Sequence, residues 1–337
     1  MSAQSRARSL LVAGLVLGGG LVGCGGDQSA LDPESGQSRA IADLWWWMLI
    51  AATIVFLGAV GLLLLAWVRR GSEGFPFFGK SERVSVGLVL TFGIFIPIVS
   101  LIALFVVANL SVAEGTDAPE KGSTSMTVEV VARQWFWEVH YPGTGAVTAN
   151  EIHIPARTRV NLVAKTDDVI HSFWVPRLNR KIDMIPGRTN RILLDADRPG
   201  RYRGQCAEFC GLQHAHMGFV VFADPPGRFR AWLAGQERDR RAPTTPERKR
   251  GERVFLDEAC SGCHTIRGTS AAGRVGPDLT HVASRTTLAG NTIPNDGRYL
   301  RQWVLDPQHV KPGNKMPALD LSKAEARDLL DYLESLR

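Results

Sequence analysis

The chain has 337 residues, enough for two or more domains, and 45% of them are hydrophobic, with long uncharged runs in the first third. The net charge of +6 is too mild and too dispersed to indicate a nucleic-acid partner. The five cysteines divide into one near the N-terminus and two in each of two later motifs, which leaves no disulfide framework to propose.

The N-terminal segment is predicted to direct export. Arg6 and Arg8 precede an apolar run over residues 10–21, which is short for a membrane span. The run ends in Leu-Val-Gly-Cys24, which resembles a bacterial lipoprotein signal, so residues 1–23 are expected to be removed and Cys24 to be lipidated. An ordinary signal peptide with an incidental cysteine is the alternative. Residues 24–43 are expected to form an exposed tether.

Two uncharged segments, 44–68 and 84–111, each exceed the roughly 20 residues that a spanning helix needs, and they predict a transmembrane hairpin. Trp45 and Trp67 lie near the ends of the first span, as interfacial anchors do. Pro97 is expected to kink the second span. The loop 69–83 carries more basic than acidic residues, so the positive-inside rule places it in the cytoplasm and both ends of the hairpin outside.

Beyond a polar linker, residues 125–235 are predicted to form an all-β domain. Alternating and β-branched runs separated by Gly and Pro turns favour an antiparallel sandwich or barrel. Alternation would place Trp135 and Trp137 on one face of a strand and Phe136 on the other. The expected strands cover residues 126–131, 134–140, 151–154, 159–163, 190–194 and 219–222.

Residues 204–217 gather soft metal ligands in one loop. Cys206 and Cys210 are four residues apart, His214 follows four residues later and Met217 three after that. Thiolate, imidazole and thioether groups together suit copper, and two thiolates in one loop can bridge two metal ions. The upstream His171 is the best candidate for a second histidine. A disulfide or a zinc loop is the alternative, although zinc sites more usually have two cysteine pairs and no methionine.

These residues resemble the CuA-binding subunit II of haem-copper cytochrome c oxidases, which implies a cupredoxin fold and a dinuclear copper centre. The implied ligands are the side chains of His171, Cys206, Cys210, His214 and Met217 and the backbone carbonyl of Glu208. The resemblance also implies that the Glu208 side chain reaches a magnesium ion at the border with subunit I, and that electrons enter through Trp135. Glu82 lies too far upstream of Pro97 to take the proton-channel role of a glutamate in that family.

After a charged, exposed linker over residues 236–250, in which a helix is expected to start near Pro246, residues 251–337 are predicted to form an all-α haem domain. Cys260 and Cys263 belong to a C-x-x-C-H motif, in which both thiols can bond to haem vinyl groups and His264 then lies under the iron. Half a zinc site is the alternative, but no second cysteine pair is nearby. The candidates for the sixth iron ligand are His281, His309 and Met316.

The same region resembles the small class I cytochromes c. The segment around Met316 resembles their distal methionine loop, and residues 275–279 resemble the segment that packs on the proximal histidine. Methionine ligation would raise the haem potential relative to bis-histidine ligation, as suits a late respiratory carrier. Ser322 and Glu325 form a capping-box pattern that predicts the start of a last helix.

The chain is therefore identified as a member of the multi-domain oxidase subunit II family with a fused cytochrome c domain. The resemblance implies electron transfer from an external donor through haem c and CuA to the haem centres of subunit I, which reduces oxygen and pumps protons. The implied partners are subunits I and III, membrane lipid, and a cytochrome c or a cytochrome bc-type complex. The implied location is the bacterial inner membrane, multi-pass, with both redox domains on the periplasmic face.

Three other classes of protein agree less well with the sequence. The CuA domain of nitrous oxide reductase and a copper-trafficking lipoprotein could both use the ligand loop, but the two spans and the haem domain argue against them. A quinol-oxidase subunit II would lack the copper ligands that are present here. The copper domain is also predicted to be net positive, with 14 basic and 10 acidic residues over 125–235. We therefore expect the tethered haem domain, rather than a free basic cytochrome, to deliver its electrons. The basic residues that lie close together after His171 are Arg177, Arg180, Lys181, Arg188 and Arg191.

Overall fold

The computed structural model describes residues 26–69, 81–113, 118–120 and 122–337. The chain divides into two compact units, one formed by Gly36–Asp117 and the other by the residues before and after it. The predicted signal peptide 1–23, the predicted lipid site Cys24 and residues 70–80 of the predicted cytoplasmic loop lie outside the described residues.

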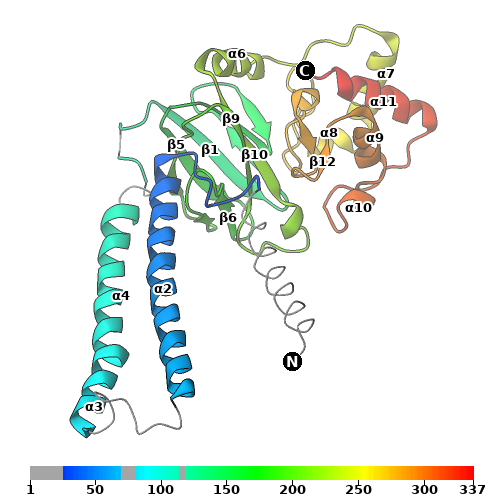
Figure 1. The fold of residues 1–337 in the computed structure, drawn as a ribbon. Helices are drawn as coiled ribbons and strands as arrows, with labels where there is room; N and C mark the ends of the chain where they lie inside the picture. Colours follow the sequence, from blue (N-terminus) through cyan, green and yellow to red (C-terminus); the bar gives the residue numbers. More distant parts are fainter. Residues whose placement is uncertain (1–25, 70–80, 114–117, 121) are drawn as a thin grey trace, which may run out of the picture. The chain divides into compact units, whose positions relative to one another are not determined.

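The unit Gly36–Asp117 contains two long apolar helices (Figure 1). The first is α2, Gly36–Val68, which begins before the predicted residue 44. The second runs through α3 (Glu82–Leu90), η1 (Thr91–Phe95), α4 (Ile96–Val107) and η2 (Ala108–Ala113). Both are long and apolar enough to cross a membrane, and their large apolar side chains are exposed, as contact with lipid requires. The π-helical η1 ends two residues before Pro97, which lacks the N–H group that would continue α-helical bonding.

The segment that precedes α2 is not the exposed tether expected over residues 24–43. Glu34 and Ser35 are buried, and the Glu34 carboxylate forms ion pairs with Arg177 and Arg198. The Ser35 hydroxyl donates to the carbonyl of Leu178. The prediction was wrong because a polar composition does not reveal that the carboxylate has two guanidinium partners far along the chain.

The all-β domain consists of two five-stranded sheets, which confirms the predicted sandwich. The strand order is β3-β2-β1-β5-β8 in one sheet and β4-β10-β9-β6-β7 in the other. The strands are β1 Met126–Arg133, β2 Phe136–His140, β3 Val147–Ala149, β4 Glu151–Pro155, β5 Val160–Thr166, β6 His171–Trp174, β7 Ile182–Met184, β8 Asn190–Leu194, β9 Gly200–Cys206 and β10 Gly218–Asp224. Two pairs, β1 with β5 and β4 with β10, are parallel rather than antiparallel, because the chain crosses to the other sheet between them.

Aromatic side chains fill the sandwich core at the end that carries the copper loop. Trp137 is fully buried, with its ring centroid 4.9 Å from that of Phe219, which in turn stacks on Phe173 at 4.6 Å. Gly204 admits Phe219, since a Cβ there would lie 2.3 Å from that ring. Trp135 precedes β2, so the expected strand alternation does not apply to it. Trp137 therefore serves the core, whereas Trp135 is only partly buried against it.

The C-terminal domain is built mainly from helices, as predicted. Its elements are α7 Pro246–Asp257, α8 Cys260–Cys263, η4 Val282–Ser284, β11 Thr287–Leu288, β12 Ile293–Pro294, α9 Gly297–Leu305, α10 Pro307–Val310 and α11 Lys323–Ser335. Helices α7 and α11 pack closely at Gly251, where a Cβ would lie 2.0 Å from the Asp328 carbonyl oxygen. The predicted capping box of Ser322 and Glu325 is present at the start of α11.

The connection between the two domains differs from a free linker over residues 236–250. Helix α6, Pro226–Gln236, packs on the sandwich through Phe229, and α7 begins at Pro246, where a helix was expected to start. Between these helices, the Arg267 guanidinium donates to the carbonyl oxygens of Gln236 and Arg238. The short connection is therefore bonded to the haem domain.

Candidate copper and haem centres

The copper loop joins two neighbouring strands of one sheet. Strand β9 ends at Cys206, the short η3 helix spans His214–His216, and β10 begins at Gly218. Strand β6 begins at His171 and pairs with β9, with Phe173 opposite Cys206. This pairing carries His171 to the cysteines from a distant part of the sequence.

The structure brings all the predicted copper ligands together. Cys206 Sγ lies 3.9 Å from His171 Nδ1 and 3.1 Å from the carbonyl oxygen of Glu208. Cys210 Sγ lies 3.7 Å from His214 Nδ1 and 3.7 Å from Met217 Sδ. Within the described residues, His171, Cys206 and Cys210 form a buried group that could hold a metal ion. Two sulfurs at the centre, each with its own histidine, form a donor set that fits two copper ions.

The two cysteines are not joined by a disulfide. Their Sγ atoms are 3.8 Å apart, far beyond the roughly 2.05 Å of an S–S bond, and both are buried free thiols. The hydrogen bond from Cys210, with a smaller effect of His171, lowers the pKa of Cys206 to about 3. The same bond raises the pKa of Cys210. The two thiols share one hydrogen bond, and metal binding, which requires thiolates, would displace the protons that remain.

Asp168, which the sequence did not indicate, orients His171. Its carboxylate lies 2.9 Å from His171 Nε2 and accepts N–H bonds from Gln134 and Val169. Burial opposes the charge on Asp168, but these hydrogen bonds prevail and lower its pKa to about 2. The ionised Asp168 accepts a hydrogen bond from His171 Nε2–H, so the proton stays on Nε2 and Nδ1, which faces Cys206, is left free to bind a metal. An acidic residue three positions before a candidate histidine was the available signal.

Trp135 and Gln134 bind the copper loop at one carbonyl group. The indole Nε1 of Trp135 and the amide of Gln134 both donate to the carbonyl oxygen of Cys210, at 3.0 Å and 2.8 Å. Gly211 follows with φ of 108°, and a Cβ there would lie 3.1 Å from the indole. Trp135 is thus in direct contact with the loop through its indole N–H.

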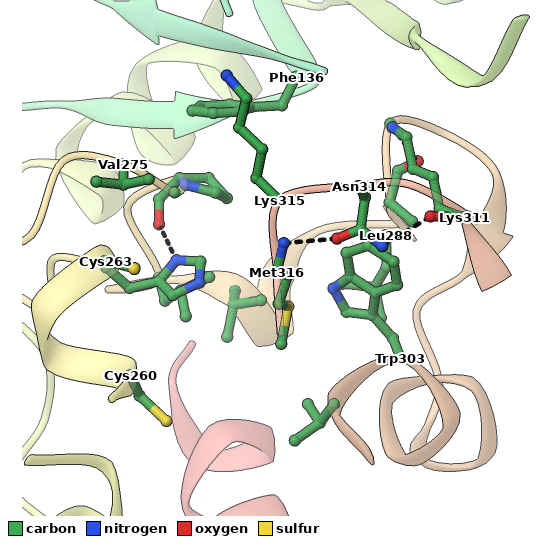
Figure 2. A pocket seen from close by; sticks show the side chains of 18 of the residues that line it. Phe136, Cys260, Cys263, Val275, Leu288, Trp303, Lys311, Asn314, Lys315 and Met316 are labelled. Atoms are coloured by element: carbon green, nitrogen blue, oxygen red, sulfur yellow. Dashed lines mark hydrogen bonds between the residues drawn. The ribbon is translucent and has the colours of Figure 1, made fainter. Parts of the chain in front are cut away.

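The predicted haem ligands line one apolar cavity in the C-terminal domain. Figure 2 shows Cys260 and Cys263 on one helix, with Met316 pointing into the cavity that they border. Residues His281 and His309 are not among the lining residues of this described cavity. Met316 is therefore the candidate sixth ligand that the fold brings to the cavity.

The chain orients both predicted axial residues. His264 Nδ1 lies 2.8 Å from the carbonyl oxygen of Pro277, which leaves Nε2 available, and burial lowers the pKa of His264 so that the neutral ring is favoured. A Cβ at Gly276 would lie 2.4 Å from the His264 ring, so the segment does pack on this histidine. On the other side, the Met316 amide donates to the Asn314 side chain at 2.7 Å.

Residues of the copper domain also line the haem cavity. They include Trp135 and Phe136, the second of which is visible at its upper edge in Figure 2. Lys311 links the domains: its Nζ donates to the carbonyl oxygens of Trp135 and His216, both at 2.8 Å. Burial lowers the pKa of Lys311 to about 7, whereas its carbonyl partners favour the protonated amine. No pattern in the sequence singled out Lys311.

The predicted surface cluster of basic residues is partly occupied by internal ion pairs. Arg177 binds Asp32 and Glu34, and Lys181 binds Asp183 and lies 3.6 Å from the Glu208 carboxylate. Arg177 therefore serves to attach the segment before α2, and it is not a free docking charge.

The β-sandwich carries a ligand set for copper, and the helical domain carries one for covalent haem. Together with the two candidate membrane spans, these sites define a membrane-bound electron-transfer protein. Residues 146–223 match the family described as "Cytochrome C oxidase subunit II, periplasmic domain", and residues 248–337 match "Cytochrome c". The chain is 35% identical over 327 residues to cytochrome c oxidase subunit 2 of Alkalihalophilus pseudofirmus, covering 94% of each chain. It is 28% identical over 340 residues to that of Bacillus subtilis, again covering 94% of each.

The chain belongs to the cytochrome c oxidase subunit II family, which confirms the resemblance found in the sequence. Among solved structures, the periplasmic domain of subunit II from Bradyrhizobium japonicum is 28% identical and matches 34% of this chain and 94% of that one, with a TM-score of 0.33. Family membership makes the chain an electron-transfer subunit of a haem-copper oxidase, and it implies CuA, haem c and a partner subunit I. With the two apolar helices, it indicates a membrane-anchored protein with a periplasmic domain.

Proposed function

We propose that this chain passes electrons from an external donor through haem c and dinuclear CuA to subunit I, where oxygen is reduced and protons are translocated. The observation that carries the proposal is the position of Trp135. It lines the cavity that holds the candidate haem ligands, and its indole donates to the carbonyl of Cys210 in the copper loop. One residue therefore contacts both predicted redox centres.

The chain would hold each cofactor with the residues that surround the two sites. The proposed CuA ligands are His171, Cys206, Cys210, His214 and Met217, with the carbonyl of Glu208. The proposed haem c residues are Cys260 and Cys263 as covalent attachments and His264 and Met316 as axial ligands. Bound there, the two groups supply reversible one-electron chemistry. The protein supplies burial, orientation through Asp168 and Pro277, and a contact through Trp135.

The finer features of the assembly rest on the family resemblance. We propose a multi-pass topology with the loop between α2 and α3 in the cytoplasm, lipidation at Cys24, and contact with subunit III. A cytochrome c or a cytochrome bc-type complex would be the donor. We also propose that the exposed Glu208 carboxylate reaches a magnesium ion in the complex, where the ion would replace its present neighbour Lys181. The proposed limits are 125–235 for the copper domain and, because α7 begins at Pro246 rather than at the predicted residue 251, 246–337 for the haem domain.

The experiment is the copper and haem content of the purified oxidase with Cys206→Ser or Cys210→Ser. We expect either change to abolish the dinuclear copper signal in electron-spin resonance while the chain still enters the membrane and binds haem, because each copper loses a ligand. Phe209→Ser is the matched control, since Phe209 lies in the same loop with its side chain 75% exposed. A cysteine variant that keeps two coppers and the parent signal would contradict the assignment.

A further inference from the structure

The loop between β11 and β12 is fitted against the copper domain. Ala289, Gly290 and Asn291 have φ values of 54°, 72° and 61°, a left-handed run that costs free energy at the two residues other than glycine. Such backbone persists where surrounding contacts hold it. Here the amide of Gly218 donates to the carbonyl of Gly290 at 3.0 Å, and a Cβ on Gly290 would lie 2.6 Å from the carbonyl oxygen of His216. The copper domain thus supplies the contacts that hold this loop.

Lys311 lies beside the same loop and bonds across the domain contact. Its Nζ donates to Trp135 and His216 in the copper domain, and to Ala289 in the haem domain at 3.2 Å. A lysine ammonium has three donors, so three carbonyl oxygens satisfy it. The side chain is 3% exposed, and a buried cation is tolerated only with such partners. One side chain therefore anchors the haem domain to two backbone carbonyls of the copper domain.

A second polar contact between the two domains lies at Thr286, three residues before this loop. The buried Glu151 of β4 accepts bonds from the amide and the hydroxyl of Thr286, at 2.6 Å and 2.5 Å. The contacts at Thr286 and at Lys311 both hold the haem domain against the copper domain. One of the Lys311 bonds is accepted by the backbone carbonyl of Trp135, so this contact holds the backbone of that residue directly.

We propose that Lys311 and residues 289–291 form a docking clamp, which holds the haem domain over Trp135 and keeps soluble cytochromes away from that residue. Lys311 is a positioning residue: it acts through the carbonyl of Trp135, whose indole contacts Cys210. The proposal rests on the proposed electron path. The proposal adds that the haem domain is already docked when it passes electrons to the copper loop. A haem domain held only by its linker would instead have to diffuse to the copper loop before each transfer.

The test uses the full chain in the assembled oxidase, with Lys311→Met to remove the donors. Lys323→Met is the matched control, because Lys323 is exposed at the start of α11. Gly290→Ala tests the clamp independently, since the added methyl group would meet the carbonyl of His216. The first measurement is hydrogen exchange at the Gly218 amide, and the second is the rate of copper reduction after rapid photoreduction of haem c.

We expect the protection of the Gly218 amide to fall about tenfold in Lys311→Met and Gly290→Ala, as loss of a charged hydrogen bond predicts, and to stay unchanged in Lys323→Met. Copper reduction should show a single fast phase in the parent and an added slow phase in the two clamp variants. The clamp would be overturned if both variants kept the parent's protection of the Gly218 amide and reduced copper in a single fast phase. It would also be overturned if a variant lost haem or copper while the Gly218 amide stayed protected. Absence of haem-to-copper transfer in the parent would instead overturn the proposed electron path.

Discussion

Replacing Asp168 by asparagine tests whether the carboxylate tunes the copper site through His171. The change keeps the size of the side chain but removes the negative charge that lies 2.9 Å from His171 Nε2. Asp168 also accepts the backbone amides of Gln134 and Val169 on different oxygens, and an asparagine, with one oxygen, can keep only one of these two bonds. The change also removes the charged partner of the imidazole, which fixes the ring and makes Nδ1 a better ligand. Removing such partners lowers metal affinity by about 10- to 100-fold, or about 1.4–2.7 kcal/mol.

The assay is competition for copper between a chelator and the purified full-length chain, with the copper signal followed by electron-spin resonance. Asp167→Asn is the matched control: the neighbouring carboxylate bonds Arg133 at 2.6 Å, and its side chain is 51% exposed. We expect the control to bind copper like the parent. If Asp168→Asn binds copper within twofold of the parent, or if both variants lose the same affinity, the carboxylate does not act through His171.

The remaining predictions concern the C-terminal domain. Met316→Ala should leave haem covalently attached through the untouched Cys260 and Cys263, lower the haem potential and open the iron to external ligands; optical redox titration with an added ligand measures this, and a spectrum identical to the parent would exclude Met316 as the ligand. Gly251→Ala should reduce the stability of this domain by about 1–3 kcal/mol, because the new Cβ meets the backbone of α11. Thermal unfolding measures the loss, and Gly235→Ala in α6, where a Cβ meets nothing within 4 Å, should show none; equal melting temperatures for Gly251→Ala and the parent would contradict the packing argument.

Short-range patterns were enough to find most of the two candidate centres. The two cysteines, His214 and Met217 lie within one loop, so their spacing alone brings their side chains together. Likewise, Cys260 and Cys263 lie on one short helix, α8, with His264 directly after it. The two membrane segments could also be predicted from the sequence alone, because a helix that faces lipid consists of a long run of apolar, uncharged residues. Family resemblance then supplied the role of His171, which lies on another strand.

Contacts between distant segments could not be predicted in the same way. The parallel pairing of β1 with β5 depends on where the chain changes sheets, which alternation does not encode. Trp135 and Trp137 looked equivalent in the sequence, but β2 begins between them, so one packs on the copper loop and the other fills the core. The sequence predicted that Glu34 belongs to an exposed polar tether, but in the structure its carboxylate forms ion pairs with Arg177 and Arg198.

By itself the sequence determined the domain classes, the two membrane segments, the copper loop and the haem attachment motif, because each depends on neighbours in the chain or on composition. Only the tertiary structure decided that Asp168 holds His171, that Met316 reaches the haem cavity while His281 and His309 do not, and that Lys311 bonds the copper domain. A lysine or an aspartate acquires such a role from the partners that surround it. Those partners lie far away in the sequence. The packing of the intervening loops and strands, rather than any local sequence pattern, brings the partners within hydrogen-bond distance.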